Sequence, residues 1–557
     1  MKELRTPIQV RREKRIAIGA LVLLMATFVT TASLDNGYNW DEWKQIETTR
    51  ASVRQVEFDQ TKLVWSGIAF WPGVIVAGLH MVPELPNIIR EMKAQPAMPF
   101  DAGRYPTLRA WQTNMYRQIG AERFKAEVRL VHVLLTAPAL LWVFLTLLRL
   151  FPRRYLEAVA GSALLGTSWE VAQRARCTEV DAPMMQFVAL AVLMISVALT
   201  VRSRQGGLLA ALGLGAVAAA VVGCKISGVY MASVTVVALF RIPMWSGVKD
   251  RLVLLLAFTG ALIAVYAAVS PETYVGPIRN VHNAFNSMGL YNSVAPPHPY
   301  YVEPPFEHMG RVFVWLGCVL PSSNVALAVV LSLVAGVGIY SLAKGRRAFA
   351  AIVAIYPATM LATLVNMPIL QLRNYLLFAP ILAVAFGAGV IWLRVRARRH
   401  PPAETVLAAV VVAILLFNVG FLFYADHSVR HTTRDSLMEE VREYIAATDH
   451  DLWVSPRLSR NLGNSLDEHF VCEPRAEDDP LADDARVLLY YTDHHPRNWL
   501  SFRLGFVERI FAPLDANYEW YVTWKGKLEQ HRMALLGRES AEEMNVPYTR
   551  YIGCRRR

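Results

Sequence analysis

The sequence is poor in the residues from which many soluble enzymes build nucleotide and metal sites. Of its 557 residues, only 18% are charged and five are cysteines. It has no Gly-rich loop of the Walker type and no CxxC pair, which argues against a nucleotide-driven motor and a structural zinc module. Five cysteines in so long a chain are also too few for a disulfide framework.

Apolar residues are abundant instead. They make up 54% of the chain, and many lie in runs long enough to cross about 30 Å of hydrocarbon. This composition predicts an α-helical polytopic membrane protein with about eleven spans. The spans are expected near residues 16–33, 130–151, 155–170, 183–201, 206–223, 227–241, 251–270, 323–343, 347–365, 375–394 and 403–424.

The formal net charge of +12 comes from short Lys and Arg clusters between the apolar runs, so we expect no nucleic-acid partner. Such clusters begin near residues 151, 202, 241, 343 and 394, and loops of this kind stay on the cytoplasmic side. With the N-terminus also cytoplasmic, we expect a multi-pass protein of the cell inner (plasma) membrane. The segments expected outside are 34–44, 174–181, Lys225, 271–322, Arg373 and the chain after about 425.

Residues 63–81 are apolar enough to span, but counting them would move every later basic cluster to the outer side. We therefore expect a re-entrant or interfacial element here, which contains Pro72. The segment spans only if a second weak span lies between residues 82 and 126.

The composition changes after residue 424, which predicts two domains: a membrane bundle over 1–424 and a small extracytoplasmic α/β domain over 425–557. In the second domain we expect a first helix over 434–447 and strands near 451–456, 486–493 and 518–524. Cys472 and Cys554 in this domain either pair, in an oxidising compartment, or remain two thiols.

Two carboxylates, Asp41 and Glu42, follow the first span in the stretch LDNGYNWDEWK. A carboxylate at the mouth of a helix bundle can take a proton from a hydroxyl nucleophile, especially where partial burial raises its pKa. The same stretch also fits an ordinary acidic loop that is anchored by tryptophans at the membrane interface.

A second polar group precedes the span at 183–201. It contains Arg174, Arg176, Glu179 and Asp181, and cations with carboxylates at a helix entrance suit an anionic head group or a metal ion. Asp181 followed by Ala-Pro also has the pattern of a helix cap. Capping would leave the two arginines unexplained.

Single cations and a long loop add further candidates on the same side. Lys225 in GCKISGVY and Arg373 in LQLRNYLLFAP either reach toward the interface or face a polar cavity. The loop over 271–322 contains His298 and Tyr301 among other histidines and aromatic residues. Its spacing matches no metal motif, so a Pro-rich lid is the expected form.

The order of these elements resembles the GT-C glycosyltransferases. The Asp-Glu pair follows the first span, the stretch GRYPTLRAWQ leads into the next, the 176–181 segment opens a later one, and GCKISGVY, HPYY and LRNYLLFAPILA follow. The closest in kind are the protein O-mannosyltransferases (glycosyltransferase family 39) and the lipid A aminoarabinose transferases, over roughly residues 16–394. The chain departs from them in a longer first outer loop and in GRYPTL, where relatives often have a His-Pro-Pro-Leu signal.

The resemblance implies transfer of a sugar from a polyprenyl phosphate to a hydroxyl of a protein, lipid or glycan, with inversion at the anomeric carbon. It implies Asp41 as the base, Glu42 as a neighbouring carboxylate that positions the acceptor or binds a metal, and Asp181 as a second acidic position that orients the acceptor or the cations. It implies substrate-binding roles for Arg174, Arg176, Lys225, Arg373, Tyr301 and His298. A divalent cation is left open as cofactor, because such families divide between metal-assisted and metal-independent sites.

A polytopic transporter or flippase for a lipid-linked or polar substrate is the alternative, because polar side chains within a bundle also mark substrate paths. Against it, the carboxylates and cations gather on one side, and the sequence has no visible repeated halves. A non-catalytic assembly protein of the envelope is a third alternative.

Overall fold

The structure is a computed structural model. It describes residues 7–32, 42–55, 70–95, 102–119, 122–176, 180–243, 245–270, 304–368, 370, 372–398 and 400–430, together with six strands after residue 450. The chain divides into two compact units. The first comprises Met1–Ser33, Gln55–Val76 and Val128–Phe423, and the second comprises Leu34–Arg54, Ala77–Glu127 and Tyr424–Arg557.

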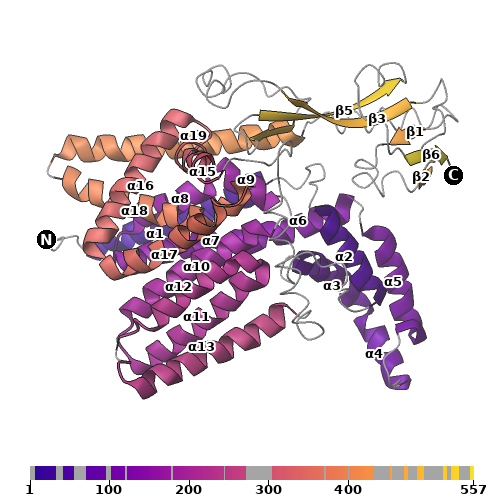
Figure 1. Ribbon diagram of the computed structural model, residues 1–557, viewed down its shortest axis with the longest axis horizontal. Coiled ribbons are helices and arrows are strands. Elements are labelled where there is room, and N and C mark those ends of the chain that lie inside the picture. Colours follow the sequence, from indigo (N-terminus) through magenta and orange to yellow (C-terminus); the bar gives the residue numbers. More distant parts are fainter. Residues whose placement is uncertain are drawn as a thin grey trace. The chain divides into compact units, whose positions relative to one another are not determined.

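The first unit is a bundle of helices (Figure 1). Its helices are α1 (Pro7–Thr31), α7 (Pro138–Leu150), α8 (Tyr155–Gly166), α9 (Trp169–Arg176), α10 (Asp181–Thr200), α11 (Arg204–Cys224), α12 (Val229–Leu239), α13 (Val248–Val269), α15 (Phe306–Cys318), α16 (Val325–Gly345), α17 (Arg347–Leu364), α18 (Ala379–Ala397) and α19 (Pro401–Arg430). Two short 3-10 helices, η5 (Ile226–Gly228) and η7 (Leu372–Phe378), interrupt it. Helices α3 (Trp71–Met81) and α6 (Glu122–Thr136) belong partly to each unit.

Ten helical segments among the described residues are long and apolar enough to cross a membrane, as a multi-pass membrane protein requires. All but one lie at predicted spans. The predicted spans near 155–170 and 227–241 are the shorter helices α8 and α12, of 12 and 11 residues. The remaining segment, Trp71–Ala94, extends the apolar 63–81 stretch toward the C-terminus, and its length and composition also suit a span.

Helices α10 and α18 are the most deeply buried parts of the bundle. Helix α10 packs against α7, α11 and η7, and α18 packs against α16 and α8 (Figure 1). Two crossings require glycine, because a Cβ on Gly338 would collide with the carbonyl oxygen of Ala385, and one on Gly215 with that of Phe258. Such small residues allow helix backbones to approach closely in apolar surroundings.

The basic connections predicted to share one side of the membrane meet at one end of this bundle. Arg149 donates from Nε to Oγ1 of Thr200 at 2.7 Å, and Arg346 donates from Nη2 to the carbonyl oxygen of Leu150 at 2.5 Å. Further contacts join Arg204 to Asp250 and Arg394 to Glu157. The five clusters therefore share one end of the bundle, and we call it the basic end.

The opposite end is held together by contacts between other connections. Trp71 donates from Nε1 to the carbonyl oxygen of Val269 at 3.0 Å. Ser168 donates from Oγ to the carbonyl oxygen of Leu320 at 2.6 Å. We call this the acidic end, because Asp181 lies here at the start of α10.

The second unit contains α2 (Glu42–Gln55), η3 (Val82–Glu84), α4 (Leu85–Ala94), η4 (Ala102–Arg104) and α5 (Pro106–Gln118). Arg50 of α2 donates from Nη2 to the carbonyl oxygen of Ile119 at 3.0 Å, just after α5. Glu91 of α4 accepts the backbone N–H of Thr107 in the first turn of α5 at 3.1 Å. A carboxylate stabilises a helix at this position because it faces the positive end of the helix dipole.

Six strands of the second unit form one sheet in the order β2-β6-β1-β3-β5-β4. They are β1 (Leu452–Val454), β2 (Phe470–Pro474), β3 (Arg486–His494), β4 (Glu519–Val522), β5 (Leu528–Gly537) and β6 (Ile552–Arg556). Among these six strands, β1 and β3 pair in parallel, and the other pairs are antiparallel. Strands β1, β3 and β4 lie at the three strand positions predicted from the sequence.

The register of β2 and β6 sets Cys472 opposite Cys554. The two alternatives for this pair, a disulfide or two thiols, both stay open. The helix expected over 434–447 lies outside the described residues, so an α/β domain over 425–557 also stays a prediction.

Candidate functional site

A cluster of charged side chains surrounds Asp181 at the acidic end of the bundle. The carboxylate is 2% exposed, and Nζ of Lys225 lies 3.1 Å from its Oδ1. Nε of Arg373 lies 3.7 Å from its Oδ2. Lys225 also donates to Oδ1 of Asn374 at 2.7 Å. Three segments that are far apart in the sequence therefore meet at one carboxylate, and we call these four residues the Asp181 cluster.

The cations of the Asp181 cluster come from breaks between helices. Lys225 follows the last residue of α11 in an extended conformation (φ −161°, ψ 145°) and precedes η5. Arg373 and Asn374 lie in the 3-10 helix η7. In a membrane bundle, irregular backbone is tolerated only where it is buried in protein or lines a polar space, and broken helices often form substrate sites.

Asp181 does not have the capping role that its sequence context also allowed. It is the first residue of α10, and the cap position belongs to Val180, which makes no side-chain capping bond. The carboxylate of Asp181 instead engages Lys225 and Arg373. Charge pairing, and not helix capping, therefore accounts for this residue.

Within the Asp181 cluster, one carboxylate lies close to two cations. A buried carboxylate is costly unless it is paired, which explains why both cations lie close to Asp181. Their side chains are nevertheless 20% exposed for Lys225 and 24% exposed for Arg373. Both cations therefore present charged N–H donors of the kind that bind anions.

Two uncharged groups lie beside the cluster. Tyr356 of α17 is fully buried, and its hydroxyl has no hydrogen-bond partner among the described residues. Cys224 is buried and directly precedes Lys225. The charge of Asp181 acts on both side chains. An unpartnered buried hydroxyl costs on the order of 1–3 kcal/mol, so Tyr356 has a bonding capacity that the described residues do not use.

The two arginines of α9 have different surroundings. Arg176 is 3% exposed. Its Nη2 lies 3.3 Å from the carbonyl oxygen of Thr31 in the last turn of α1. Its guanidinium also lies 4.6 Å from the centre of the Trp169 ring. Arg174 is only partly buried. The structure thus places Arg176 against the end of α1.

Other predicted site residues lie outside what the structure describes. Asp41, His298 and Tyr301 belong to segments without described positions. Glu42 is the first residue of α2, but its side chain is not among those described. The roles predicted for these residues stay predictions.

Sequence analysis missed two members of the site. Asn374 directly follows Arg373 in the quoted stretch LQLRNYLLFAP, so its position beside a candidate cation was a usable signal. Tyr356 lies in the middle of an apolar helix and was not distinguishable there from a core aromatic residue.

The described residues contain no group of three or more His, Cys, Asp or Glu side chains that could hold a metal ion. Asp181 is occupied by two cations, which does not fit a metal ligand. The side chains of Asp41 and Glu42 lie outside the described residues, so a divalent cation as cofactor stays open.

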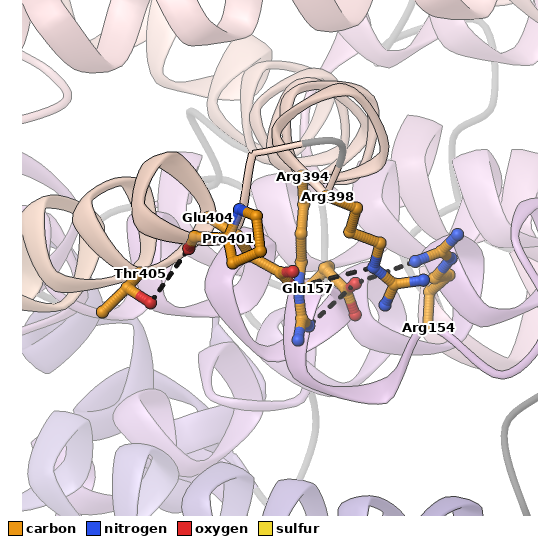
Figure 2. A network of polar contacts seen from close by, with 7 residues as sticks. All are labelled: Arg154, Glu157, Arg394, Arg398, Pro401, Glu404 and Thr405. Atoms are coloured by element: carbon orange, nitrogen blue, oxygen red, sulfur yellow. Dashed lines mark hydrogen bonds and ion pairs between the residues drawn. The ribbon is translucent and has the colours of Figure 1, made fainter.

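A second charged network lies at the basic end (Figure 2). Glu157 of α8 is 2% exposed and accepts from Nη1 of Arg394 in α18 at 3.1 Å. It also accepts from Nη1 of Arg154 at 3.3 Å. Arg394 reaches Glu404 of α19 at 2.8 Å, and Arg398 lies 3.6 Å from the same carboxylate. We call these five residues the Glu157 network.

Comparison with known proteins gives similarities only among solved structures. No protein family and no curated protein matches the sequence. ArnT from Cupriavidus metallidurans, bound to undecaprenyl phosphate, is 10% identical with a TM-score of 0.43, over 74% of this chain and 70% of that chain. The Archaeoglobus fulgidus oligosaccharyltransferase, in complex with Zn and sulfate, is 15% identical with a TM-score of 0.40, over 74% and 53%. This chain thus covers about half of the oligosaccharyltransferase.

Proposed function

We propose that this chain is an integral-membrane inverting glycosyltransferase of the GT-C type. It moves a sugar from a polyprenyl-phosphate donor to a hydroxyl of a protein, lipid or glycan at the outer face of the inner (plasma) membrane. The shared basic end supports this orientation, because short basic loops remain in the cytoplasm. The N-terminus is then cytoplasmic, and the segment after residue 425 is extracytoplasmic.

The observation that carries this proposal is the convergence of Lys225 and Arg373 on Asp181 at the end opposite the basic loops. A polyprenyl tail is too apolar to leave the bilayer, so its phosphate must meet protein cations at the edge of the hydrocarbon. Broken helices that bring partly exposed cations to this depth suit a lipid phosphate.

The proposed reaction is one direct displacement. The Asp41 carboxylate takes the proton of the acceptor hydroxyl, and the oxygen forms a bond to the anomeric carbon. The bond from that carbon to the phosphate oxygen breaks, and its electron pair stays on the departing lipid phosphate. Because a single displacement occurs, the configuration inverts, and no enzyme nucleophile is needed. Glu42 lies next to the base and positions the acceptor.

The proposed role of the cations follows from the charge that develops on the leaving phosphate. Lys225 and Arg373 stabilise this charge more strongly as the bond breaks. Asp181 keeps the two cations close together although they repel each other. Substrate-binding roles are also proposed for Arg174, Arg176, His298 and Tyr301.

The proposal is tested with the purified full chain in nanodiscs and a panel of polyprenyl-phosphate sugars and acceptors. Release of free lipid phosphate is followed. Asp41→Asn should lower the rate by about 10²- to 10⁴-fold, the usual contribution of a general base. The matched control is Asp250→Asn, which removes a carboxylate paired with Arg204 at the basic end and should keep the rate.

The outcomes separate the alternatives. Unchanged release in Asp41→Asn would defeat the assignment of the base. No release across a broad panel, with movement of intact lipid-linked substrate between leaflets, would favour the transporter or flippase.

A further inference from the structure

His308 holds the helix that carries Arg373 and Asn374. It lies in the first turn of α15 and is 1% exposed. Its Nδ1 is 3.0 Å from the carbonyl oxygen of Met367, just after α17. Its Nε2 is 2.8 Å from the hydroxyl oxygen of Tyr375 in η7. One imidazole therefore bridges both ends of the connection from α17 to η7.

The two bonds define the proton on the imidazole. A carbonyl oxygen can only accept, so Nδ1 carries the hydrogen. In the neutral ring Nε2 is then an acceptor, and the hydroxyl of Tyr375 donates to it. Protonation of His308 would turn Tyr375 into an acceptor and place a charge in a buried position. Burial lowers the pKa of His308, so the neutral ring prevails at neutral pH.

The geometry of η7 connects this bond to the Asp181 cluster. A 3-10 helix has about three residues per turn, so consecutive side chains point about 120° apart. Tyr375 can therefore be held by α15 while Arg373 and Asn374 face the cluster. Tyr375 is 1% exposed, and its ring also packs edge-on against Phe378 at 5.9 Å between centroids.

Arg373 is sensitive to the position of η7. Its Nε lies 3.7 Å from Oδ2 of Asp181, beyond hydrogen-bond distance. By contrast, Asn374 accepts from Lys225 at 2.7 Å. A small displacement of η7 would therefore change how Arg373 divides its donors between the carboxylate and an incoming anion.

We propose that His308 is a positioning residue that, through Tyr375, fixes η7 and so aligns Arg373 and Asn374 for binding of the lipid phosphate. The part of this inference that concerns the lipid rests on the proposed function. His308 itself does not touch substrate or the reacting atoms.

Among the described residues, the elements that pack on His308 carry few other charges. On its own helix, Glu307 favours the protonated ring and pairs with Arg311. The connection after α17 supplies the carbonyl group of Met367, and η7 supplies Tyr375 and the charged Arg373. Helix α16 also packs on α15, and its one charged residue, Lys344, lies in its last turn.

Three variants separate the two bonds of the imidazole. His308→Asn retains a donor near Met367 but lacks an acceptor at the position of Nε2. His308→Gln places an amide oxygen there and can still accept from Tyr375. Tyr375→Phe removes the donor and keeps the ring. The His308→Asn and Tyr375→Phe variants should each weaken binding of decaprenyl phosphate in nanodiscs about tenfold, whereas His308→Gln should stay close to wild type.

A merely structural role would give a different pattern. All variants would then unfold at lower temperature, and the folded fraction would bind the lipid with unchanged affinity. The double variant His308→Asn with Tyr375→Phe should bind no more weakly than either single variant, because both remove one bond. Additive losses would contradict the shared bond.

The pH dependence gives a second readout. Wild-type affinity should fall as the pH drops from neutral through the lowered pKa of His308. His308→Gln retains only the titration of the phosphate itself and serves as the reference curve. Identical pH profiles for the two proteins would overturn the role of the neutral ring.

Hydrogen exchange separates failure of this inference from failure of the proposed function. If the wild type binds no polyprenyl phosphate, the proposed lipid donor is wrong. Amide exchange over residues 372–378 then tests, without any lipid, whether His308 fixes η7 through Tyr375. Faster exchange in His308→Asn and Tyr375→Phe, but not in His308→Gln, supports this role of His308. Equal exchange in all four proteins overturns it.

Discussion

The Asp181 cluster and the Glu157 network lie toward opposite ends of α18, whose 19 residues extend about 28 Å. Each has one carboxylate that is 2% exposed and cationic partners that are partly exposed. They differ in the elements that supply the charged groups. In the Glu157 network, Glu157, Arg394 and Glu404 lie in the helices α8, α18 and α19, and the other two arginines lie at helix ends, whereas both cations of the Asp181 cluster come from breaks between helices.

The difference separates a structural network from a candidate binding site. Arg394 reaches two carboxylates, at 2.8 Å and 3.1 Å, so its guanidinium is held from two helices. At the acidic end, Lys225 lies 3.1 Å from the carboxylate of Asp181, and Arg373 lies at the longer distance of 3.7 Å. Similar residue types can therefore stabilise a fold at one end and remain available to a ligand at the other.

The largest expected effect on stability comes from breaking the basic end. Glu157→Gln leaves Arg154 and Arg394 without their shared carboxylate. Loss of one partner from a buried pair costs on the order of 3–5 kcal/mol. Denaturant unfolding in detergent should therefore detect a large loss of stability, while lipid-phosphate release per folded molecule stays near wild type. A stable variant would show that the network is dispensable.

The corresponding change at the acidic end should act on function. Asp181→Asn removes the charge that holds Lys225 and Arg373 together, so lipid-phosphate release should fall by about 10²- to 10³-fold. The variant should unfold within a few degrees of wild type, because Lys225 keeps its hydrogen bond to Asn374. If Glu157→Gln mainly lowered lipid-phosphate release and Asp181→Asn mainly lowered stability, the comparison between the ends would be wrong.

A matched pair of arginine substitutions gives a smaller effect. Arg373→Lys keeps the charge but loses the planar fork, so the Michaelis constant for the donor should rise about tenfold. Arg394→Lys should leave that constant unchanged and lower the unfolding temperature by a few degrees. Donor titrations and thermal scans of both variants provide the measurement.

Thiol labelling of two cysteine variants should show which end of the bundle lies on which side of the membrane. Neither substitution should change the activity. Asn366 is exposed in the turn after α17, and Lys249 is exposed at the start of α13 at the basic end. In intact cells, a membrane-impermeant thiol probe should modify Asn366→Cys and spare Lys249→Cys. The opposite pattern would invert the proposed orientation.

Much of this arrangement along the membrane normal was predictable. Apolar runs and basic clusters correctly grouped Asp181, Lys225 and Arg373 at the end opposite the basic loops. Hydropathy does not reveal which helices are neighbours around the bundle axis, because that depends on packing. The bond of Lys225 to Asn374, the burial of Tyr356 and the place of Arg176 beside Thr31 therefore required coordinates.

The close crossing of α16 and α18 at Gly338 has a consequence for the Asp181 cluster. Helix α16 touches the backbone of α18 near Ala385, and α18 continues directly from η7. An added methyl group at position 338 would wedge the two helices apart in the middle of the hydrocarbon. The guanidinium of Arg373 would then shift although every ionisable side chain is intact, so the proposed anion site would also depend on an uncharged residue in the lipid interior.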